Sequence, residues 1–347
     1  MACHLKIRFR INVMNYDYQD IIMVRNDIFP ILDVSCLSDN YTAVSDWEGA
    51  KLQHDVQVNN LVEELSNGFS DWGFLYVKGH GIPQNLIDGA FKMSEKFFKQ
   101  EKETKMSYKR GPGISEGYVP IKGEVFDEMK PEDIKEAFDF LPNSDVSKKL
   151  SQEMPEVVTE LNELFEHCST LLYKLLRLLA VALGIDTETF VNLHTNIGNR
   201  SLNGTSLRTL FYPHINRPTA ENQRRCGEHT DYGTITLLFQ DNIGGLEVLS
   251  PSGKFVKAVP IPGTIVVNAA DLLHTWSNGK FRATIHRVQI PTDPMRLSMP
   301  RQSIAFFAHP NYDVTINYQD ENGKSKTRNA YEHLKKRFDS TILTDNV

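Results

Sequence analysis

Apolar residues recur every three or four positions in several stretches of the first half of the chain, a period that predicts amphipathic helices. Residues 58–69 carry one such apolar face, and a second face begins just after Pro83, which suits the first turn of a helix. The longest helix is predicted over residues 155–183, where Gly184 provides a natural stop. Its stripe of leucine and phenylalanine indicates core packing, and a helix of this length can brace a sheet from outside.

From Thr209 onward the pattern changes to short apolar runs, among them LEVL, FVKAV and TIVVN. Turns rich in Gly, Pro, Asn or Ser separate these runs, which is typical of short strands in an antiparallel sandwich or barrel. Residues 328–338 then predict a closing helix. Helices followed by strands indicate an α+β fold, in which an N-terminal helical region and bracing helices surround a two-sheet jelly roll.

The composition is that of an ordinary globular chain, with 347 residues of which 40% are hydrophobic and 24% charged. The net charge of −6 provides no basic patch for a nucleic-acid backbone, so we expect no nucleic-acid partner. The short basic runs Arg224-Arg225 and Lys335-Lys336-Arg337 are interpreted as solvated helix or loop faces. No apolar run reaches the ~18 residues of a membrane span, so no membrane partner is expected. The four cysteines lack Cys-x-x-Cys spacing and are expected to be reduced thiols in a cytoplasmic protein.

Residues 1–27 precede the first strand-like segment and carry Lys6, Arg8 and Arg10, with no acidic residue before Asp17. They lack the sustained apolar core of a secretory signal. We expect an N-terminal extension with little order, with an organellar signal as the alternative.

His229 and Asp231 stand two positions apart in GEHTDYGTITLLF, and His286 lies far downstream in TIHRVQI. On an extended backbone, residues two positions apart point to the same face, and both motifs sit in apolar, β-branched surroundings. Two imidazoles and one carboxylate suit an open ferrous site, because they occupy one face of an octahedron. Two sheets of a jelly roll can bring such distant strands to one cavity. The alternative is ordinary, because most His-x-Asp pairs bind no metal and the chain has 11 histidines.

Arg301 and Ser303 fall on one face of the strand predicted in RQSIAFFAHP. An arginine fork beside a hydroxyl is well suited to a carboxylate. A structural ion pair with Asp or Glu is the alternative, since an arginine buried without a partner is costly.

Together these segments resemble the iron(II)/2-oxoglutarate-dependent dioxygenases of the isopenicillin N synthase-like family. The resemblance rests on GEHTDYGTITLLFQDNIGGLEVL, DLLHTWSNGKFRATIHRV and RQSIAFF, and on FPILDVS and GFSDWGFLYVKGHGI nearer the N-terminus. It covers about residues 28–342 and implies a double-stranded β-helix. The implied division is an N-terminal dioxygenase region at 28–150 and, at 151–342, a jelly-roll core with its long bracing helix.

The resemblance implies that His229, Asp231 and His286 bind iron and carry the catalysis. It implies that Arg301 and Ser303 hold the distal carboxylate of 2-oxoglutarate, together with Tyr212, which precedes a proline in LFYP. A second Arg-x-Ser pair, Arg296 and Ser298, has a spacing common in plant members. We favour Arg301 because an apolar strand follows it, whereas prolines bracket Arg296. Ala270 replaces a glycine of many relatives, which is a minor departure.

The implied activity is the hydroxylation, or another oxidation, of a small organic molecule, with release of succinate and CO2. It uses Fe(II), 2-oxoglutarate as co-substrate and O2, with ascorbate in support, and we expect a monomer. By family position, Tyr118, Phe138 and Phe307 are candidates for the mouth of the substrate cavity, with a place among the core aromatic residues as the alternative for all three. Two alternatives stay open: a 2-oxoglutarate-independent oxidase of the same fold, of the isopenicillin N synthase or ethylene-forming type, and a catalytically silent binding protein.

Overall fold

The structure, a computed structural model, describes residues 29–37, 55–111, 116–124, 131–216 and 219–341. The expectation of a poorly ordered extension at residues 1–27 lies outside these ranges. Within them, no helix is both long and apolar enough to cross a bilayer. The helices are α3 (Val56–Asp71), α4 (Gln84–Phe98), α5 (Lys102–Met106), α6 (Asp145–Glu153), α7 (Pro155–Leu183), α8 (Thr187–Asn192), α9 (Asp271–Trp276), α10 (Pro294–Leu297) and α11 (Ala330–Asp339).

The predicted helices are confirmed, and their ends follow from local chemistry. Asp55 caps α3, because its carboxylate accepts hydrogen bonds from the first free backbone N–H groups of the helix, those of Gln57 and Val58. Helix α7 ends where Gly184 takes a left-handed conformation at φ 68°, which a residue without Cβ adopts at no steric cost.

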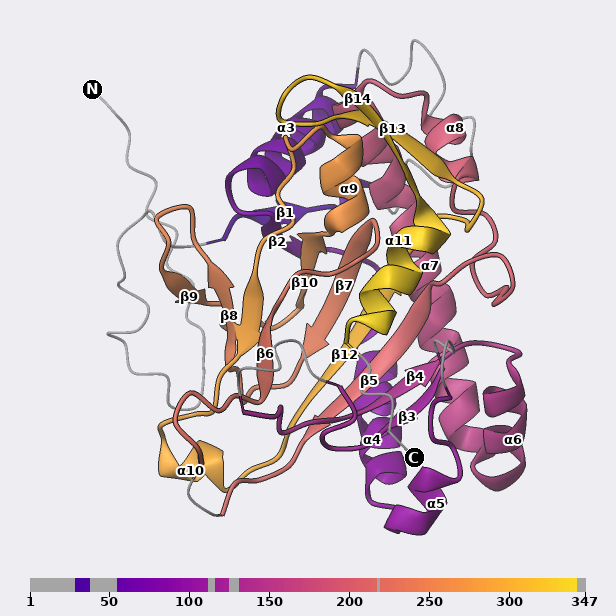
Figure 1. Cartoon of the computed structure of the whole chain (residues 1–347), viewed down its shortest axis with the longest axis vertical. Coiled ribbons are helices and arrows are strands. Elements are labelled where there is room, and N and C mark those ends of the chain that lie inside the picture. The colour runs from indigo at the N-terminus through magenta and orange to yellow at the C-terminus, as the bar shows by residue number, and fades with distance from the viewer. Residues whose placement is uncertain (1–28, 38–54, 112–115, 125–130, 217–218, 342–347) are drawn as a thin grey trace.

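Two sheets form the β part of the molecule (Figure 1). The large sheet has eight strands in the order β1-β2-β10-β7-β12-β5-β4-β3, and the small sheet has four in the order β6-β11-β8-β9. This architecture confirms the expected α+β jelly roll. The large sheet comprises β1 (Ile31–Asp33), β2 (Phe74–Lys78), β3 (Gly117–Val119), β4 (Glu136–Phe140), β5 (Ser206–Tyr212), β7 (Ile235–Gln240), β10 (Thr264–Ala269) and β12 (Arg301–Ala308); the small sheet comprises β6 (Cys226–His229), β8 (Leu246–Leu249), β9 (Phe255–Lys257) and β11 (His286–Val288); a separate hairpin pairs β13 (Thr315–Gln319) with β14 (Ser325–Asn329).

The two faces of β12 meet different surroundings because its side chains alternate. Ile304 and Phe306 face the helices, where the ring of Phe306 lies 5.1 Å from that of Phe165 on α7. Figure 1 shows α7 running behind the large sheet, as a brace of this kind requires. Arg301, Ser303 and Ala305 fall on the other face, toward the space between the sheets. Polar groups on that inner face therefore gather in one enclosed region.

Strand register then determines which side chains meet. In the large sheet Arg301 of β12 lies opposite Tyr212 of β5. In the small sheet His286 of β11 lies opposite His229 of β6. Segments far apart in the sequence are thus held side by side by backbone hydrogen bonds.

Candidate active site

The structure brings His229, Asp231 and His286 together. One ligand atom from each lies within 4.8 Å of the others, and among the described residues this is the one such group of His, Cys, Asp and Glu. The Nε2 atoms of His229 and His286 lie 3.9 and 3.7 Å from Oδ1 of Asp231. The three atoms face a common point, which fits a single metal ion held from one side.

The Nδ1 atom of each imidazole forms a hydrogen bond that orients the ring. The Nδ1 of His229 lies 2.8 Å from the carbonyl oxygen of Gly227, and that of His286 lies 3.1 Å from the carbonyl oxygen of Thr284. Because a carbonyl only accepts, Nδ1 carries the proton and Nε2 presents its lone pair. Burial lowers the pKa of both histidines, that of His286 to about 4 with the help of neighbouring His229. Both rings are therefore neutral at neutral pH, which is the form that binds a metal.

Asp231 is held as firmly as the histidines. Its Oδ2 accepts hydrogen bonds from Thr236 Oγ1 at 2.6 Å and Asn268 Nδ2 at 2.7 Å, which leaves Oδ1 for a metal. Burial alone would raise the pKa of Asp231, but the two imidazoles and these hydrogen bonds bring it below the ordinary value. The carboxylate is therefore ionised, as ligation requires. The donor set fits the ferrous ion that the sequence implied.

We expect Asn268→Ala to weaken Fe(II) binding by about 10–100-fold, the usual effect of removing an outer contact that orients a metal ligand. The reason is that Asp231 would lose one of the two donors that fix its rotation. Anaerobic Fe(II) titration measures the change, with the melting temperature of the metal-free protein as control. An Fe(II) affinity equal to that of the wild type would show that Asn268 does not position Asp231.

Arg301 is buried on the inner face with only 1% of its surface exposed. Its Nε donates to the carbonyl of Gly244 at 2.6 Å, and its Nη1 donates to Ser303 Oγ at 3.1 Å. Its guanidinium carbon lies 4.7 Å from the centre of the Tyr212 ring. Among the described residues no Asp or Glu forms an ion pair with Arg301, so the structural ion pair considered from the sequence is not found. A buried guanidinium lacking a carboxylate partner suits a ligand that brings one.

The competing Arg296/Ser298 pair lies on and at the end of a short helix, not on a strand of the inner face. Arg296 lies on the short helix α10, and its side chain is 32% exposed with Nε 3.8 Å from Asp293 Oδ2. The Ser298 hydroxyl donates to the carbonyl of Met295 at the end of that helix. Neither side chain is on a strand of the inner face, in agreement with the preference for Arg301.

Sequence reasoning missed a buried cluster of charged side chains on the same inner face, which contains Arg110, Glu124, Asp139 and Arg208 and continues through Lys135 to Asp133. Arg208 Nε donates to Asp139 Oδ1 at 2.6 Å, and Arg110 Nη2 donates to Glu124 Oε1 at 2.7 Å. Although burial opposes it, the neighbouring Arg208 and Arg110 hold the pKa of Glu124 well below its usual range, so the cluster is ionised. These residues come from four separate segments of the chain, so no local sequence motif predicted the cluster.

The expected substrate-facing aromatic residues divide between the two faces of the large sheet. Phe307 shares the inner face and lies 6.0 Å from the guanidinium carbon of Arg208. Tyr118 and Phe138 are core aromatic residues, which was the alternative, because they pair with each other on the outer face and pack on Phe97 of α4. Alternation along a strand shows which residues share a face, but not which face meets the helices.

The basic run at residues 335–337 is solvated at Lys335 and Lys336, as interpreted, but not at Arg337. Arg337 on α11 reaches the loop between two metal-ligand candidates, where its Nη2 donates to the carbonyl and hydroxyl oxygens of Thr230 at 3.2 and 3.1 Å. Its guanidinium carbon also lies 4.4 Å from the ring of Tyr232. The C-terminal helix therefore supports the segment that carries His229 and Asp231.

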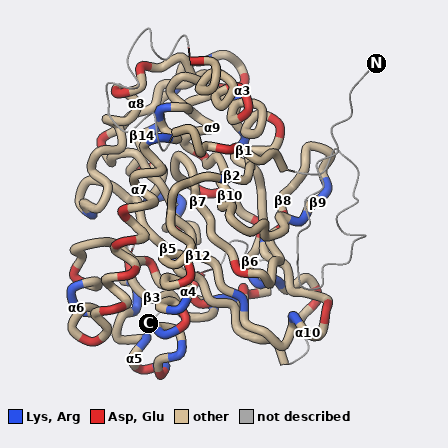
Figure 2. Tube along the Cα trace, turned by 180° about the vertical axis from the view of Figure 1, so that it is seen from behind, with Lys and Arg blue, Asp and Glu red and all other residues tan. Residues whose placement is uncertain are grey.

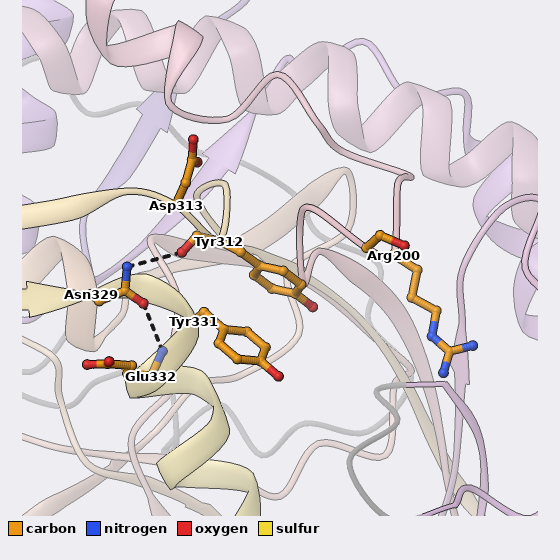
Figure 3. A pocket seen from close by; sticks show the side chains of 7 residues that line it. Arg200, Tyr312, Asp313, Asn329, Tyr331 and Glu332 are labelled. Carbon is orange, nitrogen blue, oxygen red and sulfur yellow. Dashed lines mark hydrogen bonds between the residues drawn. The ribbon is translucent and has the colours of Figure 1, made fainter.

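Away from this site, a hollow of about 570 Å³ lies beside the start of α11 and is open to solvent (Figure 3). Its polar lining contains none of the three metal-ligand candidates, and neither Arg301 nor Ser303. Asn329, at its edge, caps α11 by accepting a hydrogen bond from the Glu332 backbone N–H. The lining residues are Arg200, Ser201, Tyr312, Asp313, Asn329, Tyr331 and Glu332.

Comparison with known proteins gives two family matches along the chain. Residues 203–310, which contain the three ligand candidates and Arg301, match the 2OG-Fe(II) oxygenase superfamily. Residues 43–161 match the N-terminal region of the non-haem dioxygenases in morphine synthesis.

Similar proteins extend the match over most of the chain. A homoarginine-6-hydroxylase of Oryza sativa subsp. japonica is 34% identical, with 83% of this chain and 87% of the rice protein covered. A 2-oxoglutarate-Fe(II) type oxidoreductase of Metarhizium rileyi is 30% identical, with 86% and 82% covered. The crystal structure of a full-length Neurospora crassa protein in complex with alpha-KG and thymine is similar with a TM-score of 0.74 and 29% identity, over 92% of this chain and 98% of that one.

Proposed function

This chain belongs to the 2OG-Fe(II) oxygenase superfamily, and on that premise we propose that His229, Asp231 and His286 are its iron ligands. The enzyme is a 2-oxoglutarate-dependent dioxygenase that uses Fe(II), 2-oxoglutarate and O2. We further propose that Arg301, Ser303 and Tyr212 hold the distal carboxylate of 2-oxoglutarate. The observation that carries both assignments is one enclosed inner face with a clustered His-Asp-His group and a buried arginine that has no carboxylate partner among the described residues.

In the proposed mechanism, iron and 2-oxoglutarate, when bound, supply the activation of O2 and the release of succinate and CO2. The chain's own residues orient these groups. The Nε2 atoms of His229 and His286 and Oδ1 of Asp231 would hold the metal, and three protein ligands would leave it able to take further ligands. Arg301 fixes the far end of the co-substrate through its charge, and the apolar residues of the inner face exclude water from the reacting atoms.

We propose that the substrate is a small polar organic molecule, which the enzyme hydroxylates or otherwise oxidises. Support comes from the charged cluster of Arg110, Glu124, Asp139 and Arg208, because a wall of ionised groups favours a partner with polar atoms of its own. Phe307 beside Arg208 adds an apolar surface for the rest of such a molecule. The homoarginine hydroxylases and the thymine complex of the Neurospora crassa protein show that similar proteins act on or bind small polar compounds.

A substrate screen scored by succinate tests this proposal, with Fe(II), ascorbate and 2-oxoglutarate present. We expect a polar amino acid or pyrimidine to raise succinate release well above the rate without substrate, with about one product formed per succinate. Homoarginine and thymine belong in the panel, with apolar acids of similar size as the matched control. Product formation without succinate would instead identify a 2-oxoglutarate-independent oxidase. An enzyme that released succinate only with the apolar acids would contradict the polar-substrate proposal.

We also propose that the enzyme acts in the cytoplasm as a monomer, without nucleic acid. Cys36, Cys168 and Cys226 are free thiols in the structure, as expected of a reducing compartment. Acidic and basic residues are interspersed around the described part of the molecule, in keeping with the net charge of −6 (Figure 2). Such a surface favours a small-molecule substrate over a phosphate backbone.

A further inference from the structure

Arg225 contradicts the interpretation of Arg224-Arg225 as a solvated run. Its side chain is completely buried, and together with that of Arg301 it is among the largest fully buried side chains of the described residues. Its Nη2 donates to the carbonyl of Met299 at 3.1 Å, whereas its Nε and Nη1 have no hydrogen-bond partner among the described residues. A buried cation with two unused donors is costly unless something else supplies an acceptor.

Backbone hydrogen bonds place the Arg225 backbone close to the segments that hold Arg301. The Arg225 N–H donates to the carbonyl of Val288, and the N–H of the next residue, Gln289, donates to the carbonyl of Gly245. The adjoining carbonyl, that of Gly244, is the one that accepts from Arg301 Nε. The Met299 carbonyl that holds Arg225 lies two residues before Arg301. The two guanidinium groups therefore approach the same end of the inner face, Arg301 from β12 and Arg225 from the turn just before β6.

The charges around Arg225 and Arg301 do not balance. Burial and the positive charge of Arg301 lower the pKa of Arg225 to about 10, at which it is still protonated at neutral pH. The positive charges of both arginines lower the pKa of Asp241, although burial raises it more. The carboxylate oxygens of Asp241 accept hydrogen bonds from the backbone N–H groups of Gln302 and Ile243. No ion pair joins Asp241 to either arginine among the described residues. Two like charges in a buried place repel each other, and one carboxylate placed between them would offset that repulsion.

We propose that Arg225 is a second cationic contact for the distal carboxylate of 2-oxoglutarate, which it shares with Arg301. This inference rests on the proposed function, because it takes Arg301 as the first contact. It assigns the co-substrate site a pair of arginines, one from β12 of the large sheet and one from the turn that leads into β6 of the small sheet. The site thereby selects a dicarboxylate over a keto acid that lacks the far carboxylate.

The test compares Arg225→Met with the wild type, both loaded with Fe(II) and kept anaerobic, by calorimetric titration. We expect the Kd for 2-oxoglutarate to rise about tenfold or more, because a charge-assisted contact is lost. The Kd for 2-oxopentanoate, which keeps the keto acid but lacks the far carboxylate, should change by less than about twofold. Without ligand, the variant should melt at the same temperature as the wild type or higher, since a buried unpaired charge has been removed.

A purely structural role for Arg225 predicts the opposite pattern: a lower melting temperature without ligand, and equal weakening of both keto acids. That pattern, or an unchanged Kd for 2-oxoglutarate, overturns the inference. Arg225→Lys, which keeps the charge but loses the fork, should give an intermediate Kd and serves if the methionine variant does not fold. Arg301→Met is run in parallel. If it loses 2-oxoglutarate while Arg225→Met does not, only the inference fails; if wild type binds both keto acids equally, the proposed clamp itself fails.

Discussion

Replacing any one of His229, Asp231 and His286 by alanine is expected to remove most Fe(II) binding and nearly all turnover while the fold is kept. An open site has three protein ligands, so the loss of one is rarely compensated. The effect should exceed the roughly 10–100-fold that follows loss of an outer-shell contact. The fold should persist because the sheets that carry these residues are held by backbone pairing and by the apolar contacts of both cores; His229 ends β6, His286 begins β11, and Asp231 follows β6.

Iron content after anaerobic purification and succinate release measure the two effects, and the melting temperature reports on the fold. His167→Ala on α7 is the matched control, because it removes an imidazole from the outer helix and should leave the iron content unchanged. Full activity in any one of the three ligand variants would exclude that residue as a ligand.

Arg301→Leu is expected to raise the requirement for 2-oxoglutarate sharply, whereas Arg296→Leu leaves it nearly unchanged. Losing a charge-assisted contact of this kind costs about 1.5–3 kcal/mol, which corresponds to tenfold or more in affinity. Arg301 is buried beside Ser303 and Tyr212, while Arg296 lies partly exposed on α10. The two changes remove the same charge and the same fork, so Arg296→Leu is the internal control.

The 2-oxoglutarate concentration at half-maximal succinate release distinguishes the two arginines. If Arg296→Leu raised it and Arg301→Leu did not, the Arg296/Ser298 pair would be the real clamp. The argument that a strand rather than a proline-bracketed segment carries the clamp would then be wrong.

Local patterns made much of this molecule predictable. The 3.6-residue apolar period predicted the extent of α7, and Gly184 predicted where it ends. Both signals depend only on residues that are close in the sequence. The spacing of His229 and Asp231 was informative for the same reason. Joining them to His286 required the family resemblance, since nothing local links β6 to β11.

The residues whose positions were not predicted are those whose surroundings are set by tertiary packing. For Tyr118 and Phe138 the sequence left the cavity and the core both open, and the helices cover their face of the sheet. Arg225 and Arg337 looked like members of solvated charge runs, because adjacent basic residues usually are. One is buried beside the small sheet, and the other supports the loop at Thr230. The cluster of Arg110, Glu124, Asp139 and Arg208 joins four segments whose proximity only the strand order determines.

The central claim is that a His-Asp-His iron site and an arginine clamp together bind 2-oxoglutarate. Anaerobic titration of the protein with 2-oxoglutarate, with and without Fe(II), tests it most directly. The account predicts one 2-oxoglutarate bound per chain in the presence of Fe(II), and much weaker binding without the metal or in Arg301→Leu. Binding of equal strength with and without Fe(II), or no binding at all to the iron-loaded protein, would contradict it.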